Sequence, residues 1–221
     1  MSRYFYIIFQ YILIILIPIF ISLYGFELYL NFQNNINFQN KNLHNEEKLK
    51  KYRELSKRSQ NVSIMLQSYN LGEIKSLSGI SNSLTIYCKD EKDFMIYTSD
   101  RLGFNNRNDS IWDENNYDAV FIGDSFVHGA CVNYPYNIAD NLVNNYSNKI
   151  LNLGYSGSGP LLMFAIYMEY LKENKKSTDD IFWFYYEGND MQTLNYNVEN
   201  NSELLNYLKK DYSQKLISKD V

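Results

Sequence analysis

Residues 117–129 read YDAVFIGDSFVHG, and the rest of the chain is organised around them. The apolar run 119–122 has the composition of a buried strand, and Gly123 ends it. Asp124 and Ser125 follow, so the Ser125 hydroxyl is expected at the carboxyl end of a strand, where ligands of open α/β sheets bind. A helix that begins just after Ser125 directs free backbone N–H groups to the same place, which suits a developing oxyanion.

Two later stretches repeat this layout. Residues 149–153 form a strand-like run that leads into GYSGSGP at 154–160, and residues 181–186, IFWFYY, lead into Glu-Gly-Asn-Asp at 187–190. The run IFWFYY is apolar at successive positions, which predicts a strand inside a sheet with both faces covered. If it were the last strand, it would leave an exposed aromatic edge, so one or two further strands are expected beyond Val221.

Two helical segments separate these strands, at 134–146, where apolar residues have helical spacing, and at 161–171, which is strongly apolar. Strands that alternate with helices over short connections predict a parallel sheet with right-handed crossovers. The carboxyl ends of parallel strands meet at one edge of the sheet. Ser125, Gly157 and Asn189 are therefore expected to converge there.

The three blocks resemble the SGNH (GDSL-type) hydrolase family. Gly-Asp-Ser at 123–125 matches its first block, NLGYSG at 152–157 its second, and Gly-Asn-Asp at 188–190 its third, in the family's order and over about half of the chain. The resemblance implies a three-layer, flavodoxin-like α/β domain with a mainly parallel sheet. It also implies a serine esterase or acyltransferase that acts on small acyl esters, possibly those of glycans or lipids.

The resemblance assigns roles to individual residues. It makes Ser125 the nucleophile, with the backbone N–H groups of Ser125 and Gly157 and the Asn189 side-chain amide as oxyanion donors. Asp124 and Asp190 are supporting residues. One oxyanion donor is typically worth about 3 kcal/mol, so each role is measurable.

The general base is missing from this pattern. A serine nucleophile needs a base, which the family takes from a late Asp-x-x-His block that these 221 residues lack. His128 lies three residues after Ser125 and would share a helix face with it, as a base or as a site-edge residue. The missing block predicts either a longer chain or a degenerate site. A non-catalytic, membrane-tethered binding module that keeps the cleft is therefore the alternative function.

Each block also has a simpler interpretation. Asp124 and Ser125 are typical of a helix N-cap, and Asn189 with Asp190 is typical of a turn. The glycines at 154, 157 and 159 suit a loop with positive φ, or a phosphate-binding loop whose spacing is not the usual one. Three independent coincidences in this order explain the pattern less simply than one functional site does.

Residues 4–24 carry no charge and are long enough to cross a bilayer. A cleaved signal peptide is the alternative, but Leu-Tyr-Gly-Phe at 23–26 is a poor cleavage site. We therefore expect an uncleaved transmembrane anchor within residues 1–30. Arg3 favours the N-terminus inside, which places the soluble part in the periplasm or outside the cell.

Residues 31–80 are polar and Asn-rich and predict a stalk with a helical charged segment, whereas residues 81–221 carry the α/β domain. Within that domain, two strand-like runs separated by charged residues predict an accessory hairpin at 84–97. Residues 99–109, rich in Gly, Asn and Asp, predict a loop that leads into the domain.

Composition sets further limits. Cys88 and Cys131 are the only cysteines and are expected to pair in an oxidising compartment, with two free thiols as the alternative. The net charge of −4 provides no basic footprint for nucleic acid. No His and Cys spacing predicts a metal site, and no cofactor is expected. The expected partners are an acyl-ester substrate and, through residues 4–24, a membrane.

Overall fold

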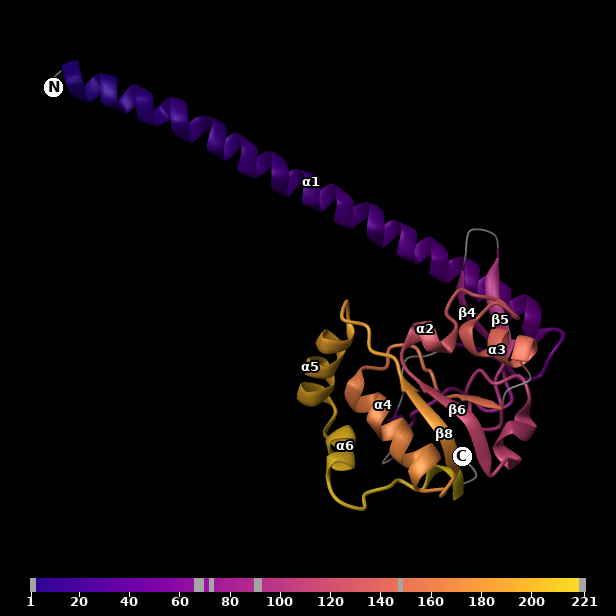
Figure 1. Cartoon of the computed structure of the whole chain (residues 1–221). Helices are drawn as coiled ribbons and strands as arrows, with labels where there is room; N and C mark the ends of the chain where they lie inside the picture. The colour runs from indigo at the N-terminus through magenta and orange to yellow at the C-terminus, as the bar shows by residue number, and fades with distance from the viewer. Residues whose placement is uncertain (1–2, 66–69, 72–73, 90–92, 147–148, 219–221) are drawn as a thin grey trace. The chain divides into compact units, whose positions relative to one another are not determined.

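A computed structural model describes residues 3–65, 70–71, 74–89, 93–146 and 149–218 (Figure 1). The chain divides into two compact units, residues 1–51 and 52–221. Each unit is described by itself below.

The described part of the first unit is helical throughout and belongs to α1 (Arg3–Ser56), a continuous helix of 54 residues that contains Pro18 and whose last turn falls in the second unit. It is long and apolar enough to cross a membrane by length and composition, as an anchor or a signal sequence. Its apolar side chains from Ile12 onward are solvent-exposed, for example Phe20 and Ile21. The helical segment that we expected inside a separate stalk is the second half of this same helix, because Asn and Gln tolerate helix and the charged run that follows favours it.

The second unit begins earlier than residue 81. Strand β1 (Val62–Ile64) pairs in parallel with β4 (Leu84–Lys89), and Leu77 is fully buried in the core. The segment that precedes residue 81 therefore belongs partly to the folded unit and not to a stalk. The expected hairpin is present: β4 pairs antiparallel with β5 (Phe94–Thr98), and the sheet order is β1-β4-β5.

The central sheet has the order β7-β6-β8, and both pairings are parallel. Its strands are β6 (Asn116–Ile122), β7 (Ile150–Asn152) and β8 (Ser177–Trp183). This arrangement confirms the mixed α/β class and the predicted parallel relation of the three strands. Two very short strands, β2 (Asn70–Leu71) and β3 (Ile74–Lys75), form an antiparallel pair elsewhere.

Helices cover both faces of β6. Val120 and Ile122 pack in one apolar cluster with residues of α4 (Pro160–Tyr167). Ala119 and Phe121 pack in a second cluster with Val127 and Ala139, which come from the two helices that follow β6. The remaining helical elements are η1 (Asp109–Asp113), α2 (Ser125–His128), α3 (Ile138–Tyr146), η2 (Met168–Lys172, π-helical), α5 (Asp190–Asn200), α6 (Ser202–Leu205), η3 (Asn206–Leu208) and η4 (Leu216–Ser218).

Strand β8 is an outer strand of the central sheet among the described residues, which is the exposed aromatic edge expected of a last strand; the strands predicted beyond Val221 stay a prediction. Within the described residues, β8 pairs only with β6, and its other edge is open. Its aromatic and aliphatic side chains are correspondingly accessible: Ile181, Phe182 and Trp183 are 44%, 48% and 42% exposed.

Helix α3 begins at Ile138 and not at Tyr134. The side chain of Asn137 accepts a hydrogen bond from the Asp140 backbone N–H at 2.8 Å and donates to the Asp140 carboxylate at 2.6 Å. This N-cap fixes the start of the helix. The preceding residues form a loop that contains the cis Tyr134–Pro135 peptide.

Candidate active site

Three loops meet at the carboxyl edge of the central sheet, because β7, β6 and β8 all run in the same direction. The loop after β7 is tied to the loop after β6 by a hydrogen bond from the Tyr155 N–H to the Gly123 carbonyl, at 3.1 Å. The segment after β8 is tied to the end of β6 by the bond from Phe184 N–H to Ile122 O, at 2.8 Å. The structure thus brings the loops that carry Ser125, Gly157 and Asn189 to one edge.

Ser125 is the first residue of α2 and is partly exposed. Asp124 caps this helix, since its carboxylate accepts from the Phe126 N–H at 2.9 Å. The Ser125 hydroxyl lies 3.5 Å from the other Asp124 carboxylate oxygen. A side chain at Gly123 would lie 2.4 Å from a Val127 methyl, so glycine is needed for this tight turn. The N-cap interpretation of Asp124 holds and leaves the Ser125 hydroxyl accessible.

Gly157 lies in a turn that is closed by a hydrogen bond from Ser158 N–H to Tyr155 O, at 3.1 Å. Its φ of +76° is the left-handed conformation that favours glycine. Gly154 has no room for a side chain, because a Cβ there would lie 2.4 Å from the His128 backbone nitrogen. Backbone conformation and close packing on α2 account for these glycines without a bound phosphate.

Asn189 and Asp190 begin α5, with Asn189 at the N-cap position. Asn189 is exposed, whereas Asp190 is only 1% exposed. One Asp190 carboxylate oxygen accepts from the Tyr186 N–H at 2.8 Å, and the other has no partner among the described residues. Burial raises the pKa of Asp190, and the nearby negative charge of Asp124 raises it further. The Gly-Asn-Asp block is therefore an N-cap and turn that also places a buried carboxyl beside Asp124.

Three hydrogen-bond donors at this edge are free. In the part of the chain that the structure describes, neither the backbone N–H of Ser125 nor that of Gly157 donates a hydrogen bond. The Asn189 side-chain amide also donates none; the backbone carbonyl of Asn189 accepts from the backbone N–H and the hydroxyl of Thr193. The three residues that bear these donors are exposed or partly exposed, so the donors are open to water and equally available to a ligand oxygen.

His128 is not placed to act as a base for Ser125. It is fully buried, and its ring lies against those of Tyr87, Tyr97 and Tyr155, at centroid distances of 5.0, 5.2 and 5.7 Å. Burial lowers the pKa of His128 to about 3, and the Gly154 backbone opposes this shift only in part. Neither ring nitrogen has a well-formed hydrogen bond within the described residues, so His128 is a neutral core residue and not a site-edge residue.

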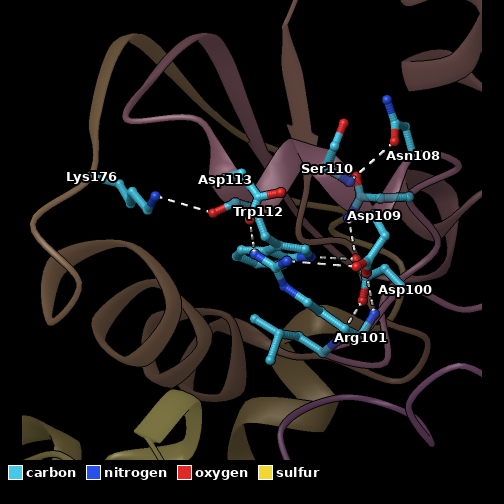
Figure 2. A network of polar contacts seen from close by, with 10 residues as sticks. Asp100, Arg101, Asn108, Asp109, Ser110, Trp112, Asp113 and Lys176 are labelled. Atoms are coloured by element: carbon cyan, nitrogen blue, oxygen red, sulfur yellow. Dashed lines mark hydrogen bonds and ion pairs between the residues drawn. The ribbon is translucent and has the colours of Figure 1, made fainter.

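The loop at 99–109 supports the site. The sequence predicted the loop but not this supporting role. The anchor of the loop is Asp100, a buried carboxylate that accepts from the Trp112 ring N–H at 2.8 Å (Figure 2). Asp100 also accepts from the Asn106 amide at 2.8 Å and from two backbone N–H groups. Burial raises the pKa of Asp100, and these hydrogen bonds oppose the rise. Nearby, Arg101 pairs with Asp113 at 2.7 Å (Figure 2).

Hydrogen bonds of two asparagines, Asn106 and Asn152, link Asp100 to the site loops. Asn106 donates to the Asn152 carbonyl and accepts from the Asn152 N–H, both at 2.9 Å. Asn152 in turn accepts from the Gly154 N–H and donates to the Val127 carbonyl, also at 2.9 Å. Asn105 donates to the His128 carbonyl at 2.9 Å. The residues Asp100, Asn106 and Asn152 thus connect the lead-in loop to both the second block and α2.

The accessory hairpin also reaches the site. Cys88 and Cys131 form a disulfide, with Cα atoms 5.2 Å apart, which joins β4 to the loop after α2. The Tyr87 hydroxyl donates to the Ser156 hydroxyl, next to Gly157. No cluster of three or more His, Cys, Asp or Glu side chains suited to a metal ion occurs in the described ranges.

Comparison with known proteins adds no relative: no family model, no curated protein and no solved structure matches this chain.

Proposed function

We propose that this chain is an SGNH-type serine esterase or acyltransferase, with Ser125 as the nucleophile. Its substrates are small acyl esters, of glycans or lipids, outside the cytoplasm. The proposal includes the three-layer, flavodoxin-like fold of that family and a membrane anchor through residues 4–24. One observation carries it: a serine at the start of a helix shares one sheet edge with three donors that have no partner among the described residues.

The donors suit the charge that forms during acyl transfer. When the Ser125 hydroxyl attacks an ester carbonyl, the carbonyl oxygen becomes negative and accepts from the N–H groups of Ser125 and Gly157 and from the Asn189 amide. The alcohol then leaves with a proton, and the acyl group stays on Ser125 until water or a second alcohol removes it. The same loops serve both steps, so one site accounts for hydrolysis and for transfer.

The proton of the Ser125 hydroxyl needs an acceptor. Among the described residues, the hydroxyl is recorded within hydrogen-bonding distance of one titratable side chain, that of Asp124 at 3.5 Å, and this carboxylate already caps α2. A carboxylate is a weak base for a hydroxyl proton, so we expect slow acylation by these 221 residues. In other enzymes that have lost their catalytic triad, oxyanion donors and substrate binding alone still accelerate the reaction by roughly 10³-fold over the uncatalysed reaction in water.

A non-catalytic, membrane-tethered binding module is the second candidate, and one observation favours it. His128 is turned into the core, and the described residues place no other imidazole beside Ser125. In this case the three free donors hold a ligand carboxylate or carbonyl without reaction. The two functions differ in one property, namely a covalent acyl group on Ser125.

The test is acylation of the full chain in detergent by p-nitrophenyl acetate, followed by mass spectrometry of the peptide that contains Ser125. We expect one acetyl group on Ser125 and slow release of nitrophenol, both lost in Ser125→Ala. Ser202→Ala is the matched control, because Ser202 is also the first residue of a helix but lies in α6. Equal nitrophenol release by wild type and Ser125→Ala, without acetylation, would refute the enzyme and leave the binding module.

A further inference from the structure

We propose that Tyr87, from the β4–β5 hairpin, is a positioning residue for the oxyanion donor of Gly157. The effect of Tyr87 on the reaction rate rests on the proposed function, whereas its effect on the turn that contains Gly157 rests on the contact between Tyr87 and Ser156. The hairpin lies outside the three sequence blocks, so it is a part of the site that the blocks do not reveal.

The hairpin is irregular at the residues that reach the site. β4 and β5 pair in register at Leu84, Thr85 and Ile86, and again at Lys89, with a register shift between. Tyr87 and Cys88 occupy that shift. A bulge redirects side chains and is frequent beside active sites. Here the two bulged residues leave the regular ladder: Tyr87 contacts the loop that carries Gly157, and Cys88 bonds to the loop that follows α2.

Tyr87 holds the turn that contains Gly157. Its hydroxyl donates to the Ser156 hydroxyl, and Ser156 and Gly157 are the two central residues of the turn closed by Ser158 N–H and Tyr155 O. Gly157 has positive φ, as in a type II turn. Type I and type II turns differ in the orientation of the peptide between the central residues, which is the peptide that bears the Gly157 N–H. Fixing Ser156 therefore fixes the direction of this donor.

The same tyrosine also contacts the Ser125 side of the site. Its ring lies 5.0 Å from that of His128 in α2. Burial raises the pKa of Tyr87, the bond to Ser156 lowers it, and the charge of Asp124 raises it. Next to it, the Cys88–Cys131 disulfide ties the hairpin to the loop after α2. The hairpin thus contacts the loop after β7 through Tyr87 and the loop after α2 through Cys88.

The experiment compares Tyr87→Phe with Tyr97→Phe in the full chain. Tyr97 is the matched control, because it lies on the same hairpin and against the same His128 ring, but its hydroxyl points to the Met65 sulfur and not to a site loop. The first readout is hydrogen exchange of the Ser158 amide, which is protected by the turn. We expect about fivefold faster exchange in Tyr87→Phe, from the loss of one hydrogen bond, and no change in Tyr97→Phe.

The second readout is Ser125-dependent hydrolysis of p-nitrophenyl acetate. Loss of a whole oxyanion donor lowers kcat by about 10²–10³-fold. A Gly157 N–H that is present but less well oriented should therefore lower kcat by roughly tenfold, with KM unchanged. Ser156→Ala should give the same loss, and the double variant no more than either single one. Unchanged Ser158 exchange in Tyr87→Phe overturns the inference. Faster exchange in a chain without Ser125-dependent activity supports the positioning role while the proposed function fails.

Discussion

Replacing His128 by phenylalanine should remove a pH-dependent destabilisation of the fold. His128 is fully buried among three tyrosine rings, and burial lowers its pKa from 6.5 to about 3. The unfolded chain therefore binds a proton at higher pH than the folded chain does. Above pH 6.5 His128 is neutral in both states and costs no stability; as the pH falls from about 6.5 toward 3, protonation of the unfolded chain progressively lowers the free energy of unfolding.

The magnitude follows from the pKa difference. Each pH unit below 6.5 costs about 1.4 kcal/mol until the folded pKa is reached, so wild type should lose roughly 2.7 kcal/mol at pH 4.5 from this residue alone. A phenyl ring has no nitrogen left without a hydrogen bond, but it is larger than imidazole. At pH 7.5 we therefore expect His128→Phe to be less stable than wild type by about 1–3 kcal/mol, the usual cost of overpacking a core, and this offset does not depend on pH.

The assay is urea unfolding of wild type and His128→Phe at four pH values between 7.5 and 4.5. The buried carboxyls of Asp100, Asp140 and Asp190 have raised pKa values and change stability in the opposite sense, but they are common to both proteins. The difference between the two proteins therefore isolates His128. A difference that stays constant over this pH range would refute the reasoning. His128→Phe should also keep any Ser125-dependent activity, because His128 is not the base.

Three further predictions concern the site and the core. Asn189→Ala should lower kcat for acetyl-ester hydrolysis by about 10²-fold with little change in KM, since it removes a donor used only in the transition state; an equal rise in KM would point to ground-state binding instead. Exogenous imidazole should accelerate acetylation of Ser125 in wild type but not in Ser125→Ala, because it supplies the missing base; the rate of Ser125 acetylation with rising imidazole measures this. Glu169→Ala should destabilise the fold by about 3 kcal/mol, as measured by thermal unfolding, because the buried Glu169 carboxylate accepts from Tyr207 at 2.7 Å, from Ser213 at 3.1 Å and from the backbone of the C-terminal segment. A near-neutral result for Glu169→Ala would mean that the segment is held by packing alone.

Composition and order were sufficient to predict the three parallel strands and the hairpin. Strand boundaries were harder, because pairing overrides composition. β8 begins at Ser177, four residues before the apolar run, since the polar residues there pair with the start of β6 in the register Asn116 to Ser177. Helix α5 was not predicted, because its sequence is polar and has weak periodicity. β1 was missed because three residues carry no detectable pattern.

The candidate site was predictable where the signal was local. Gly123, Asp124 and Ser125 follow a strand directly, and their turn chemistry is visible in the sequence. His128 was misjudged because helical spacing places residues three apart on one face, whereas α2 is a single turn covered by the hairpin. Asn105 and Asn106 were assigned to a loop, which is correct, but their hydrogen bonds reach residues far along the chain. Local composition contains no information about such partners.

The exposed side chains of β8 make the three donors unequal in local stability. Among the described residues β7 and β8 each have one paired edge, but the side chains of β7 are buried whereas nearly all those of β8 are exposed. Segments with few buried apolar contacts open first in native-state fluctuations. We therefore expect amides of β8 to exchange well before those of β6, with Asn189 following β8 when it opens. Ser125 and Gly157 follow strands that bury most of their side chains, so we expect the amides around them to exchange more slowly than those around Asn189.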